Sequence, residues 1–348
     1  MRLSAFKLSV PAKLIASNPA EPRDEARLMV VHKDTGQIEH KLFKDLLLYF
    51  QEGDALVVND TRVFPAKLRG RKEKVAGAIE VVLLRELDKT KYLWDSLIDP
   101  ARKIRIGNKL CFGHGELVAE VLDNTTSRGR TLRFLFEGPP EELYSTINQL
   151  GTVPLPAQLK RRENPQDLVR YQTVYAKHVG SVVAPAAGLH FTDELLKRLA
   201  LKGTNIVPIT LHLSLGAISA IDIEDLAKYK ISSEPFAIPE ETASAVNKAL
   251  DNKRKVCAVG ISTFKVLESS AFTSGRLKAS QGWASRLIIP PYNLKTCKSL
   301  ITNFHLSGSA PLIKTAAFGG YKLIMEAYQV AIKEKYRFFV YGDAMLII

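Results

Sequence analysis

The sequence predicts an α/β fold in which a three-layer α/β domain is interrupted by a small all-β, barrel-like domain. From Gly151 onward, apolar strand-like runs alternate with segments of helical spacing, which is typical of a sheet covered by helices. Residues 65 to about 140 instead hold short strand-like runs separated by turn residues, which favours a small barrel or sandwich. We therefore expect residues 1–64 and 150–348 to form a discontinuous α/β domain, with residues 65–149 inserted as a β-barrel.

Helix and strand signals alternate along the α/β part. Thr192 is a suitable N-cap, with Asp193 and Glu194 in the first turn and leucines at helical spacing behind them. Further helices are expected over 239–252, 262–270, 312–318 and 321–335. Strands are expected over 55–60, 205–213, 255–259, 287–290, 299–304 and 338–341. The barrel interrupts this domain if the strand 55–60 belongs to the same sheet.

The inserted segment contains strand-like runs of only four to seven residues. Turn clusters separate them at Gly107-Asn108, at Gly113-His114-Gly115 and between Asp123 and Gly129. Strands are therefore expected over 78–84, 109–112, 116–122 and 131–136.

Composition places the chain among folded globular proteins. Of its 348 residues, 46% are hydrophobic and 24% are charged, and the length suits two domains. No apolar run reaches the ~18 residues that a membrane span needs. Lys7, Pro11 and Lys13 interrupt the N-terminus, which lacks the apolar core of a secretion signal. We therefore expect a cytoplasmic protein without membrane contact.

The cysteines and histidines indicate no metal site. Cys111, Cys257 and Cys297 are far apart, and neither a Cys-x-x-Cys pair nor a His-Glu-x-x-His helix occurs. The seven histidines are scattered too. We expect no metal, although a site assembled from distant residues stays open.

The charge of the chain is strongly positive and unevenly distributed. The net charge is +13, and residues 151–348 carry 25 basic against 15 acidic side chains. A cationic folded surface favours a polyanionic partner, with nucleic acid first and a membrane second. A generally basic enzyme without such a partner is the alternative interpretation.

Three common enzyme classes lack their sequence signatures here. No Gly-x-Gly-x-x-Gly follows a strand, no Walker A loop occurs, and no Gly-x-Ser-x-Gly elbow is present. An ordinary dehydrogenase, nucleoside triphosphatase or serine hydrolase is therefore disfavoured.

Polar clusters follow the expected strands, at the edge where α/β sheets usually bind ligands. They are Asn59-Asp60-Thr61-Arg62, the run 170–175 with Tyr171 and Gln172, His212, Asn303 with His305, and Asp343. Each cluster alone is also typical of a turn or of ordinary packing.

The positions of three histidines give the clearest indication of the chemistry at this edge. The loop 184–192 reaches His190 immediately before a helix signal, where free backbone N–H groups and the positive end of the helix dipole favour a ligand. A histidine satisfied inside a core loop is the alternative. His190, His212 and His305 occupy comparable positions after apolar segments, so a shared acid–base site is expected.

Several long motifs in order make the chain resemble a known family. They are Asn59-Asp60-Thr61-Arg62-Val63 with Pro65-Ala66, Arg170 to Ala176, Ala184-Pro185 with Ala187 to Thr192, Leu267-Glu268-Ser269, Thr302 to Leu306, and Tyr336 to Phe339 followed by Tyr341 to Leu346. Together they are similar, nearly end to end, to the S-adenosylmethionine:tRNA ribosyltransferase-isomerase family of queuosine biosynthesis.

The resemblance implies a specific reaction. The family moves the ribosyl part of S-adenosylmethionine onto the aminomethyl group of 7-aminomethyl-7-deazaguanine at the tRNA wobble position, giving epoxyqueuosine, adenine and methionine. S-adenosylmethionine is then a co-substrate, and no metal or redox cofactor is implied. The family fold is an α/β domain with an inserted β-barrel. We expect a monomer whose partner is tRNA carrying the deazaguanine precursor.

The resemblance also implies roles for individual residues. Catalytic roles are expected for His190, His212, His305 and Glu268. Substrate binding is expected for Asn59, Asp60, Thr61, Arg62, Tyr171, Gln172, Gly188, Asn303 and Asp343. Phosphates of tRNA are expected to contact two basic triplets, Lys160-Arg161-Arg162 and Lys253-Arg254-Lys255.

Other positions depart from the pattern of that family. Ala186, Ser214, Ser232, Ile261 and Pro311 stand where it usually has Thr, Gly, His, Thr and Leu, and Lys265 stands where it often has Arg. Losing a hydroxyl that pairs with a buried ligand group costs about 1–3 kcal/mol. A divergent tRNA-binding paralogue with lost or altered activity is therefore the alternative function. Another enzyme that uses S-adenosylmethionine or a nucleotide on a small substrate is the third.

Overall fold

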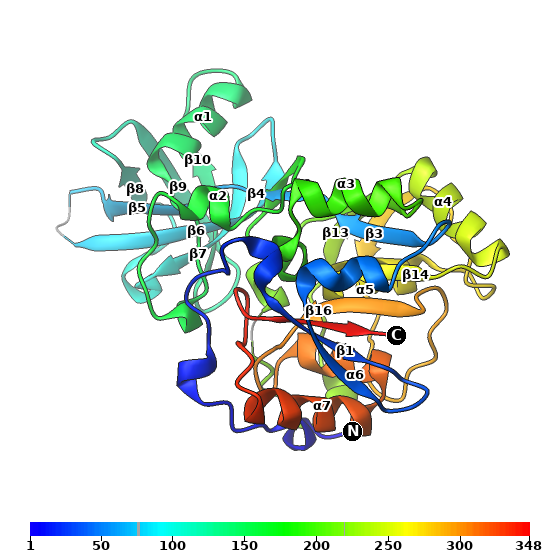
Figure 1. Ribbon diagram of the computed structural model, residues 1–348. Helices are drawn as coiled ribbons and strands as arrows, with labels where there is room; N and C mark the ends of the chain where they lie inside the picture. Colours follow the sequence, from blue (N-terminus) through cyan, green and yellow to red (C-terminus); the bar gives the residue numbers. More distant parts are fainter. Residues whose placement is uncertain (75–76, 219) are drawn as a thin grey trace.

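The computed structural model describes residues 1–74, 77–218 and 220–348, and in these residues nine strands form a mixed sheet (Figure 1). Its four central strands are all parallel. In spatial order the strands are β15 (Ser280–Ala284), β13 (Glu234–Ile238), β12 (Asn205–Leu211), β3 (Ala55–Asn59), β14 (Val256–Val259), β16 (Ser299–Asn303), β17 (Ala344–Ile347), β1 (Arg27–Val31) and β2 (Ile38–Leu42). The carboxyl ends of β12, β3, β14 and β16 therefore meet at one edge.

Helices cover both faces of this sheet because its central strands are apolar throughout. In β3, Val57 packs on one side, whereas Leu56 and Val58 pack on the other. One face carries α4 (Glu240–Asp251), α5 (Gly260–Ser270), α6 (Ala310–Gly319) and α7 (Tyr321–Lys333). The other carries α3 (Asp193–Leu201) and a 3₁₀ helix over Phe43–Leu48. This arrangement confirms the predicted three-layer α/β class, and none of the described helices is long and apolar enough to cross a membrane.

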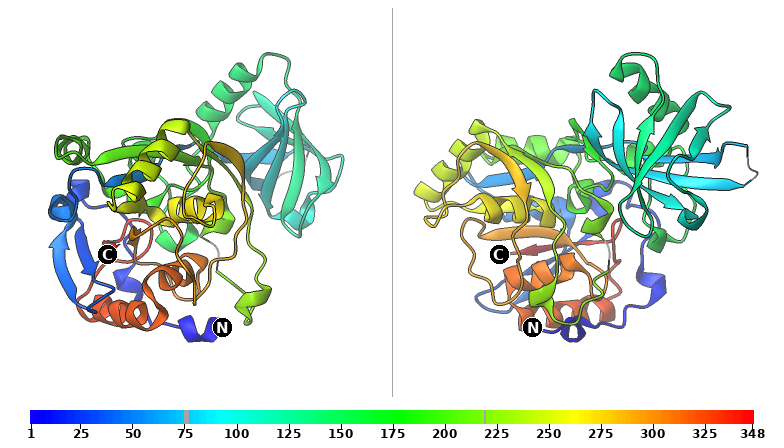
Figure 2. Two further views of the ribbon diagram at one scale, coloured as in Figure 1. Left: turned by 90° about the vertical axis from the view of Figure 1, so that its right-hand side faces the viewer. Right: turned by 180° about the vertical axis from the view of Figure 1, so that it is seen from behind.

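A closed barrel of six strands forms the smaller lobe within the residues described, and the further views show it beside the α/β part (Figure 2). Around the barrel the strands are β10 (Gly129–Phe134), β7 (Leu93–Asp99), β6 (Ala78–Asp88), β5 (Lys67–Lys72), β8 (Lys109–Phe112) and β9 (Leu117–Asn124). Alternate side chains such as Val81, Leu83 and Val121 fill its own core, to which α1 (Pro140–Leu150) adds Leu143 and Ile147. The predicted barrel-like fold is confirmed, and the limits at 65 and 149 stay a prediction.

Two predicted strands are wrong. Residues 287–290 form no strand. The last strand is β17 rather than 338–341, because that apolar run turns back on itself: Phe339 has a φ of 77°, and Gly342 N–H donates to the Phe339 carbonyl. The prediction also missed the helices α1 and α2 and nine of the described strands, among them the polar β2, the proline-containing β13 and β17 itself.

Two short elements connect the lobes. The strand β4 (Thr61–Val63) leaves β3 and pairs in parallel with β11 (His178–Ser181) before the chain enters the barrel. The short helix α2 (Asp167–Arg170) belongs to the segment that returns from the barrel. This segment leads back to the loop before α3.

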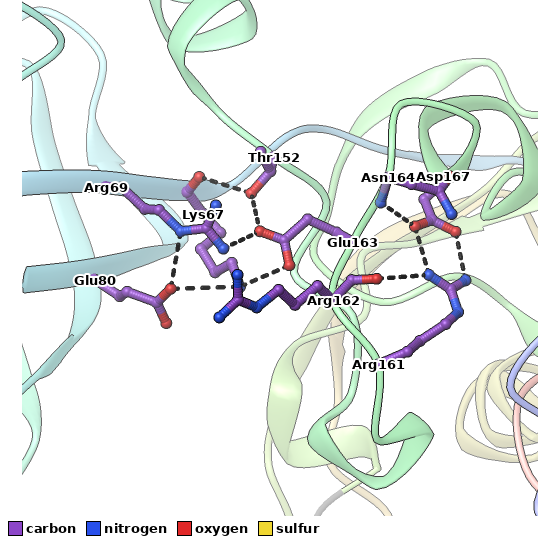
Figure 3. A network of polar contacts seen from close by, with 9 residues as sticks. All are labelled: Lys67, Arg69, Glu80, Thr152, Arg161, Arg162, Glu163, Asn164 and Asp167. Atoms are coloured by element: carbon purple, nitrogen blue, oxygen red, sulfur yellow. Dashed lines mark hydrogen bonds and ion pairs between the residues drawn. The ribbon is translucent and has the colours of Figure 1, made fainter.

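An ion-pair network on this returning segment holds the barrel (Figure 3). Glu163 lies 3.3 Å from the Nζ of Lys67 and also pairs with Arg69, both on β5. It accepts a further hydrogen bond of 3.3 Å from Thr152 Oγ1. Burial raises the pKa of Glu163, but its own backbone N–H and the two cations outweigh this and lower it. Glu163 is therefore a charged link between the lobes.

Replacing Glu163 tests how much its ion pairs contribute to the stability of the fold. The change Glu163→Gln leaves Lys67 and Arg69 without their shared carboxylate, so we expect the free energy of unfolding to fall by about 1–3 kcal/mol in low salt. Urea denaturation measures it. Glu120→Gln is the control, because Glu120 pairs with Arg133 at 2.6 Å within the barrel, nearer to solvent. Equal losses in the two variants would contradict the role of Glu163.

Candidate active site

A cavity lies at the edge where the parallel strands end. It is lined by residues that follow β12, β14 and β16, namely Leu213, Gly260 and His305, together with Asn303. The remaining lining residues come from 183–187, 216–218 and 229–234, from the first two turns of α5 and of α6 with its N-cap Ser309, and from Thr302, Leu306, Phe339 and Val340. This is the position at which an open parallel sheet binds its ligand.

Glycine geometry creates one wall of this cavity. Gly260 has a φ of +90°, a left-handed conformation that lets β14 turn directly into α5. Helix α6 begins at the cavity as well, with Ser309 as its N-cap. The first turns of two helices thus face the same space.

A buried ion pair forms the polar floor of the cavity. Lys265 Nζ lies 3.0 Å from a Glu234 oxygen and donates a second hydrogen bond of 2.9 Å to the Ser232 carbonyl. The other oxygen of Glu234 accepts from the Ser214 N–H at 3.2 Å. Both charged side chains are at most 4% exposed. Each neutralises the other, because burying either charge without its partner would cost several kcal/mol.

Two further basic groups line the cavity. His305 Nε2 lies 2.7 Å from Thr302 Oγ1, and burial, with the charge of Lys314, lowers the pKa of His305 to about 3. Burial, with the charge of Lys265, lowers the pKa of Lys314 to about 8, although Glu234 opposes this shift. At neutral pH the imidazole of His305 is uncharged and can accept a hydrogen bond from a ligand.

His190 stands behind the cavity wall. It is 5% exposed, packs against the ring of Phe43, and its Nε2 lies 3.1 Å from Asn303 Oδ1. Burial lowers the pKa of His190 to about 4, against a smaller opposing effect of Asn303. Asn303 lines the cavity and donates to the carbonyls of Phe339 and Val340. His190 therefore reaches the cavity through Asn303.

His212 belongs to a different polar group. Its Nδ1 lies 2.8 Å from Thr61 Oγ1, and it does not line the cavity. Asp60 accepts from Thr210 at 2.6 Å and faces His178 at 3.6 Å, while Arg62 is exposed. Burial and the charge of His178 lower the pKa of His212. The structure thus separates His212 from the other two histidines.

Several residues expected to bind substrate are occupied by contacts within the chain. Asn59 bridges β3 to β12, because its amide donates to the Leu211 carbonyl at 3.0 Å and accepts from the Leu211 N–H. Gln172 holds both the N–H and the carbonyl of Val63. Asp343 accepts from the Arg337 N–H at 2.7 Å and pairs with its guanidinium.

Tyr171 and Gly188 also have packing roles. Tyr171 is fully buried and lies edge-on to Tyr341. Gly188 has no room for a side chain, because a Cβ there would collide with Tyr175 Oη and would lie 2.7 Å from a Thr173 methyl. Among the catalytic and substrate-binding predictions, only His305 and Asn303 are cavity-lining residues in the described chain.

Glu268 is bound by backbone groups away from the cavity, and its catalytic role stays a prediction. It is fully buried, and its oxygens accept from the backbone N–H groups of Lys295, Thr296 and Cys297 at 2.9–3.2 Å. It does not line the cavity. The residues described contain no group of three or more His, Cys, Asp or Glu side chains that could hold a metal ion.

The two basic triplets differ in their contacts and in their position on the fold. Arg161 pairs through both terminal nitrogens with Asp167, at 2.6 and 2.8 Å (Figure 3). Lys160 and Arg162, in contrast, are exposed. The second triplet, 253–255, precedes β14 and so lies at the sheet edge opposite the cavity. There Lys255 Nζ donates to the Tyr49 carbonyl. Phosphate binding by either triplet stays a prediction.

The positions that depart from the family pattern gather at the cavity. Ala186, Ser232, Ile261 and Pro311 line it, and Ser214 contacts the cavity residue Glu234. Sequence reasoning missed Glu234, Ser262 and Lys314 as site residues, and noted Lys265 only as a departure. The usable signal was a lone lysine within each of two otherwise uncharged helix runs, Ile261 to Leu267 and Ala310 to Phe318.

Substitution of Glu268 separates a structural from a catalytic role. In Glu268→Gln an amide N–H replaces one acceptor, so a backbone N–H loses its partner and the free energy of unfolding should fall by about 1–3 kcal/mol. Chemical denaturation measures the change, with the exposed Glu326→Gln as the control. Full stability combined with lost turnover would instead assign Glu268 to catalysis.

The buried histidines predict acid sensitivity. Because the folded pKa of His190 is about 4 against 6.5 for a free histidine, the unfolded chain binds more protons between these values. Lowering the pH from 7 to 5 should cost about 2 kcal/mol of unfolding free energy through His190 alone. Urea midpoints at both pH values should show a smaller drop for His190→Gln than for the wild type. The exposed His114→Gln should match the wild type, and an unchanged drop in His190→Gln would refute the assignment.

Comparison with known proteins covers the whole chain. The family model described as "Queuosine biosynthesis protein" matches residues 3–347. Proteins named S-adenosylmethionine:tRNA ribosyltransferase-isomerase from Amoebophilus asiaticus and Cytophaga hutchinsonii are 65% and 54% identical over 348 residues, covering 100% of each chain. A crystal structure of S-adenosylmethionine tRNA ribosyltransferase from Thermotoga maritima is 30% identical, with a TM-score of 0.55, and the match covers 99% of this chain and all of that one. These findings confirm the resemblance, and the chain belongs to the queuosine biosynthesis protein family.

Proposed function

We propose that the protein is a transferase-isomerase that moves the ribosyl group of S-adenosylmethionine onto 7-aminomethyl-7-deazaguanine at the tRNA wobble position. The products are tRNA carrying epoxyqueuosine, together with adenine and methionine. The observation that carries this proposal is the full-length identity to relatives that bear the name of this activity. The cavity at the carboxyl edge of the sheet supplies a matching place for a nucleoside.

The reaction requires proton transfers that the cavity can serve. The sulfonium makes the neighbouring ribose methylene acidic, and methionine departs with the electron pair of the broken carbon–sulfur bond. The attacking amine must lose a proton, and departing adenine must gain one. His305 lines the cavity, and Thr302 Oγ1, 2.7 Å from its Nε2, orients the ring, so we assign this imidazole a proton-transfer role.

Asn303 and His190 support this site from one side. Asn303 is fixed by two backbone carbonyls and by His190, so its amide has a set orientation at the cavity wall. We assign His190 to positioning Asn303. The group of His212, Asp60, Thr61 and Arg62 lies apart from the cavity, and its role in substrate binding stays a prediction.

The remaining partners follow from the same proposal. S-adenosylmethionine serves as a co-substrate, and we propose no metal or redox cofactor. The tRNA would meet a chain of net charge +13. Action on tRNA fits a cytoplasmic location, and a monomeric state stays a prediction.

Adenine release tests the function directly. Protein mixed with S-adenosylmethionine and tRNA carrying the deazaguanine precursor should release one adenine per modified tRNA in a single turnover. His305→Ala should slow this step by about 10²–10⁴-fold. His114→Ala, on an exposed barrel turn, should leave the rate unchanged, and circular dichroism checks the fold of both variants.

The same experiment separates the alternatives. Binding of tRNA without adenine release would favour a paralogue without turnover, as the departures at the cavity suggest. Adenine release or methyl transfer without tRNA would favour another S-adenosylmethionine-dependent enzyme. Unchanged release by His305→Ala would remove His305 from the proton transfers.

A further inference from the structure

We propose that the end of the cavity formed by α5 and α6 is a carboxylate subsite. There the Lys314 ammonium, the Ser262 hydroxyl and the first N–H groups of α5 would hold the α-carboxylate of the methionyl part of S-adenosylmethionine. This inference rests on the proposed function, because it presumes that this molecule enters the cavity.

Ser262 provides the first observation. Its side chain is 7% exposed, it lines the cavity, and its Oγ has no hydrogen-bond partner in the described structure. A buried hydroxyl without a partner costs about 1–3 kcal/mol, and at a cavity wall a ligand can supply the missing partner. The ligand would have to bring an acceptor or a donor to this point of the wall.

The start of α5 provides the second observation. The helix spans 11 residues, and its N-cap Val259 offers no side-chain hydrogen bond. Its first N–H groups therefore lie uncapped beside Gly260, Ile261 and Ser262, all at the cavity. The first turn of α6 is different, because Pro311 lacks an N–H and Ser309 Oγ accepts from the Leu312 N–H. The uncapped N–H groups of α5 and their partial positive charge favour an anion.

The charge balance provides the third observation. Lys265 is neutralised by Glu234, and its Nζ is also held by the Ser232 carbonyl. Lys314 lines the same cavity, and within the described residues its ammonium has neither a hydrogen bond nor an ion pair. The same cavity therefore contains one basic group in excess of its acidic partner, together with the uncapped N–H groups of α5 and a hydroxyl without a partner. One negative charge on a planar, two-oxygen acceptor suits this set.

Charge also sets the orientation of the ligand. The sulfonium of S-adenosylmethionine is positive and is repelled by Lys314, whereas the carboxylate at the other end of the methionyl chain is attracted. Lys314 would thus point the methionyl carboxylate toward α5 and α6. Burial and the charge of Lys265 lower the pKa of Lys314 to about 8, and a carboxylate bound beside this ammonium would raise the pKa again.

Two ligands that differ in the carboxylate measure how much this group contributes to binding. Calorimetry compares the affinity of the full chain for S-adenosylmethionine and for decarboxylated S-adenosylmethionine, which keeps the sulfonium and the nucleoside. The wild type should prefer the carboxylated ligand by roughly 10- to 100-fold. In Lys314→Met this preference should largely vanish, while the affinity for the decarboxylated ligand is retained or rises.

Two more variants complete the test. Ser262→Ala should weaken binding of the carboxylated ligand by about 3- to 10-fold and leave the decarboxylated ligand unaffected. Lys322→Met, at an exposed position of α7, should preserve the wild-type preference. Added acetate or phosphate at millimolar concentration should compete only weakly, whereas strong competition would assign the subsite to a free anion.

The outcomes distinguish the subsite from the function on which it rests. Equal wild-type affinity for both ligands, or a preference unchanged in Lys314→Met, would overturn the subsite and leave the ribosyl-transfer proposal standing. Failure of the wild type to bind either ligand would overturn both proposals. Met is close to Lys in length and apolar, so Lys314→Met should fold, and its retained affinity for the decarboxylated ligand checks that it has.

Discussion

Parallel pairing of four central strands is the constraint on which the rest of this molecule depends. Because β12, β3, β14 and β16 run in the same direction, their carboxyl ends meet at one edge. The antiparallel pairing of β17 with β16 then places Ala344 beside Asn303 and brings the turn before β17 to the same edge. The directions of these strands alone bring segments that are far apart in the chain together around one cavity.

Most of the buried polar side chains named by the sequence motifs bind backbone groups instead of lining the cavity. Asn59, Asn303 and Asp343 each hold backbone groups of a neighbouring segment and are at most 2% exposed. Glu268 does the same at the opposite edge of the sheet, for the segment that precedes β16. Backbone groups of loops need such partners because water does not reach them. The motif residues therefore preserve the shape of the cavity, while the groups free for a ligand, Ser262 and Lys314, lie in the first two turns of α5 and α6. A preorganised wall lowers the cost of binding a flexible nucleoside.

The barrel joins this body through limited contacts. Glu163 links the returning segment to β5, and Arg85 on β6 lies over the ring of Trp283 on β15 at 5.2 Å. Both contacts use charged side chains. Each lobe has its own hydrophobic core, but Val182, which follows β11, is buried in the barrel core, and Leu215 packs against both cores. Polar and apolar contacts together therefore set the position of the barrel.

The sequence by itself determined the fold class, because periodicity, caps and turn residues are local signals: Thr192 caps α3 as expected, and 109–112 is a strand as expected. Its ordered motifs also determined the family. Tertiary structure alone decided which polar residues share a site, since this depends on strand order and on which side chains the backbone already occupies. It separated His212 from His305, gave Glu268 to backbone N–H groups, and brought Glu234, Lys265 and Lys314 together from three distant segments. No local pattern records contacts across eighty residues, so only the folded chain shows them.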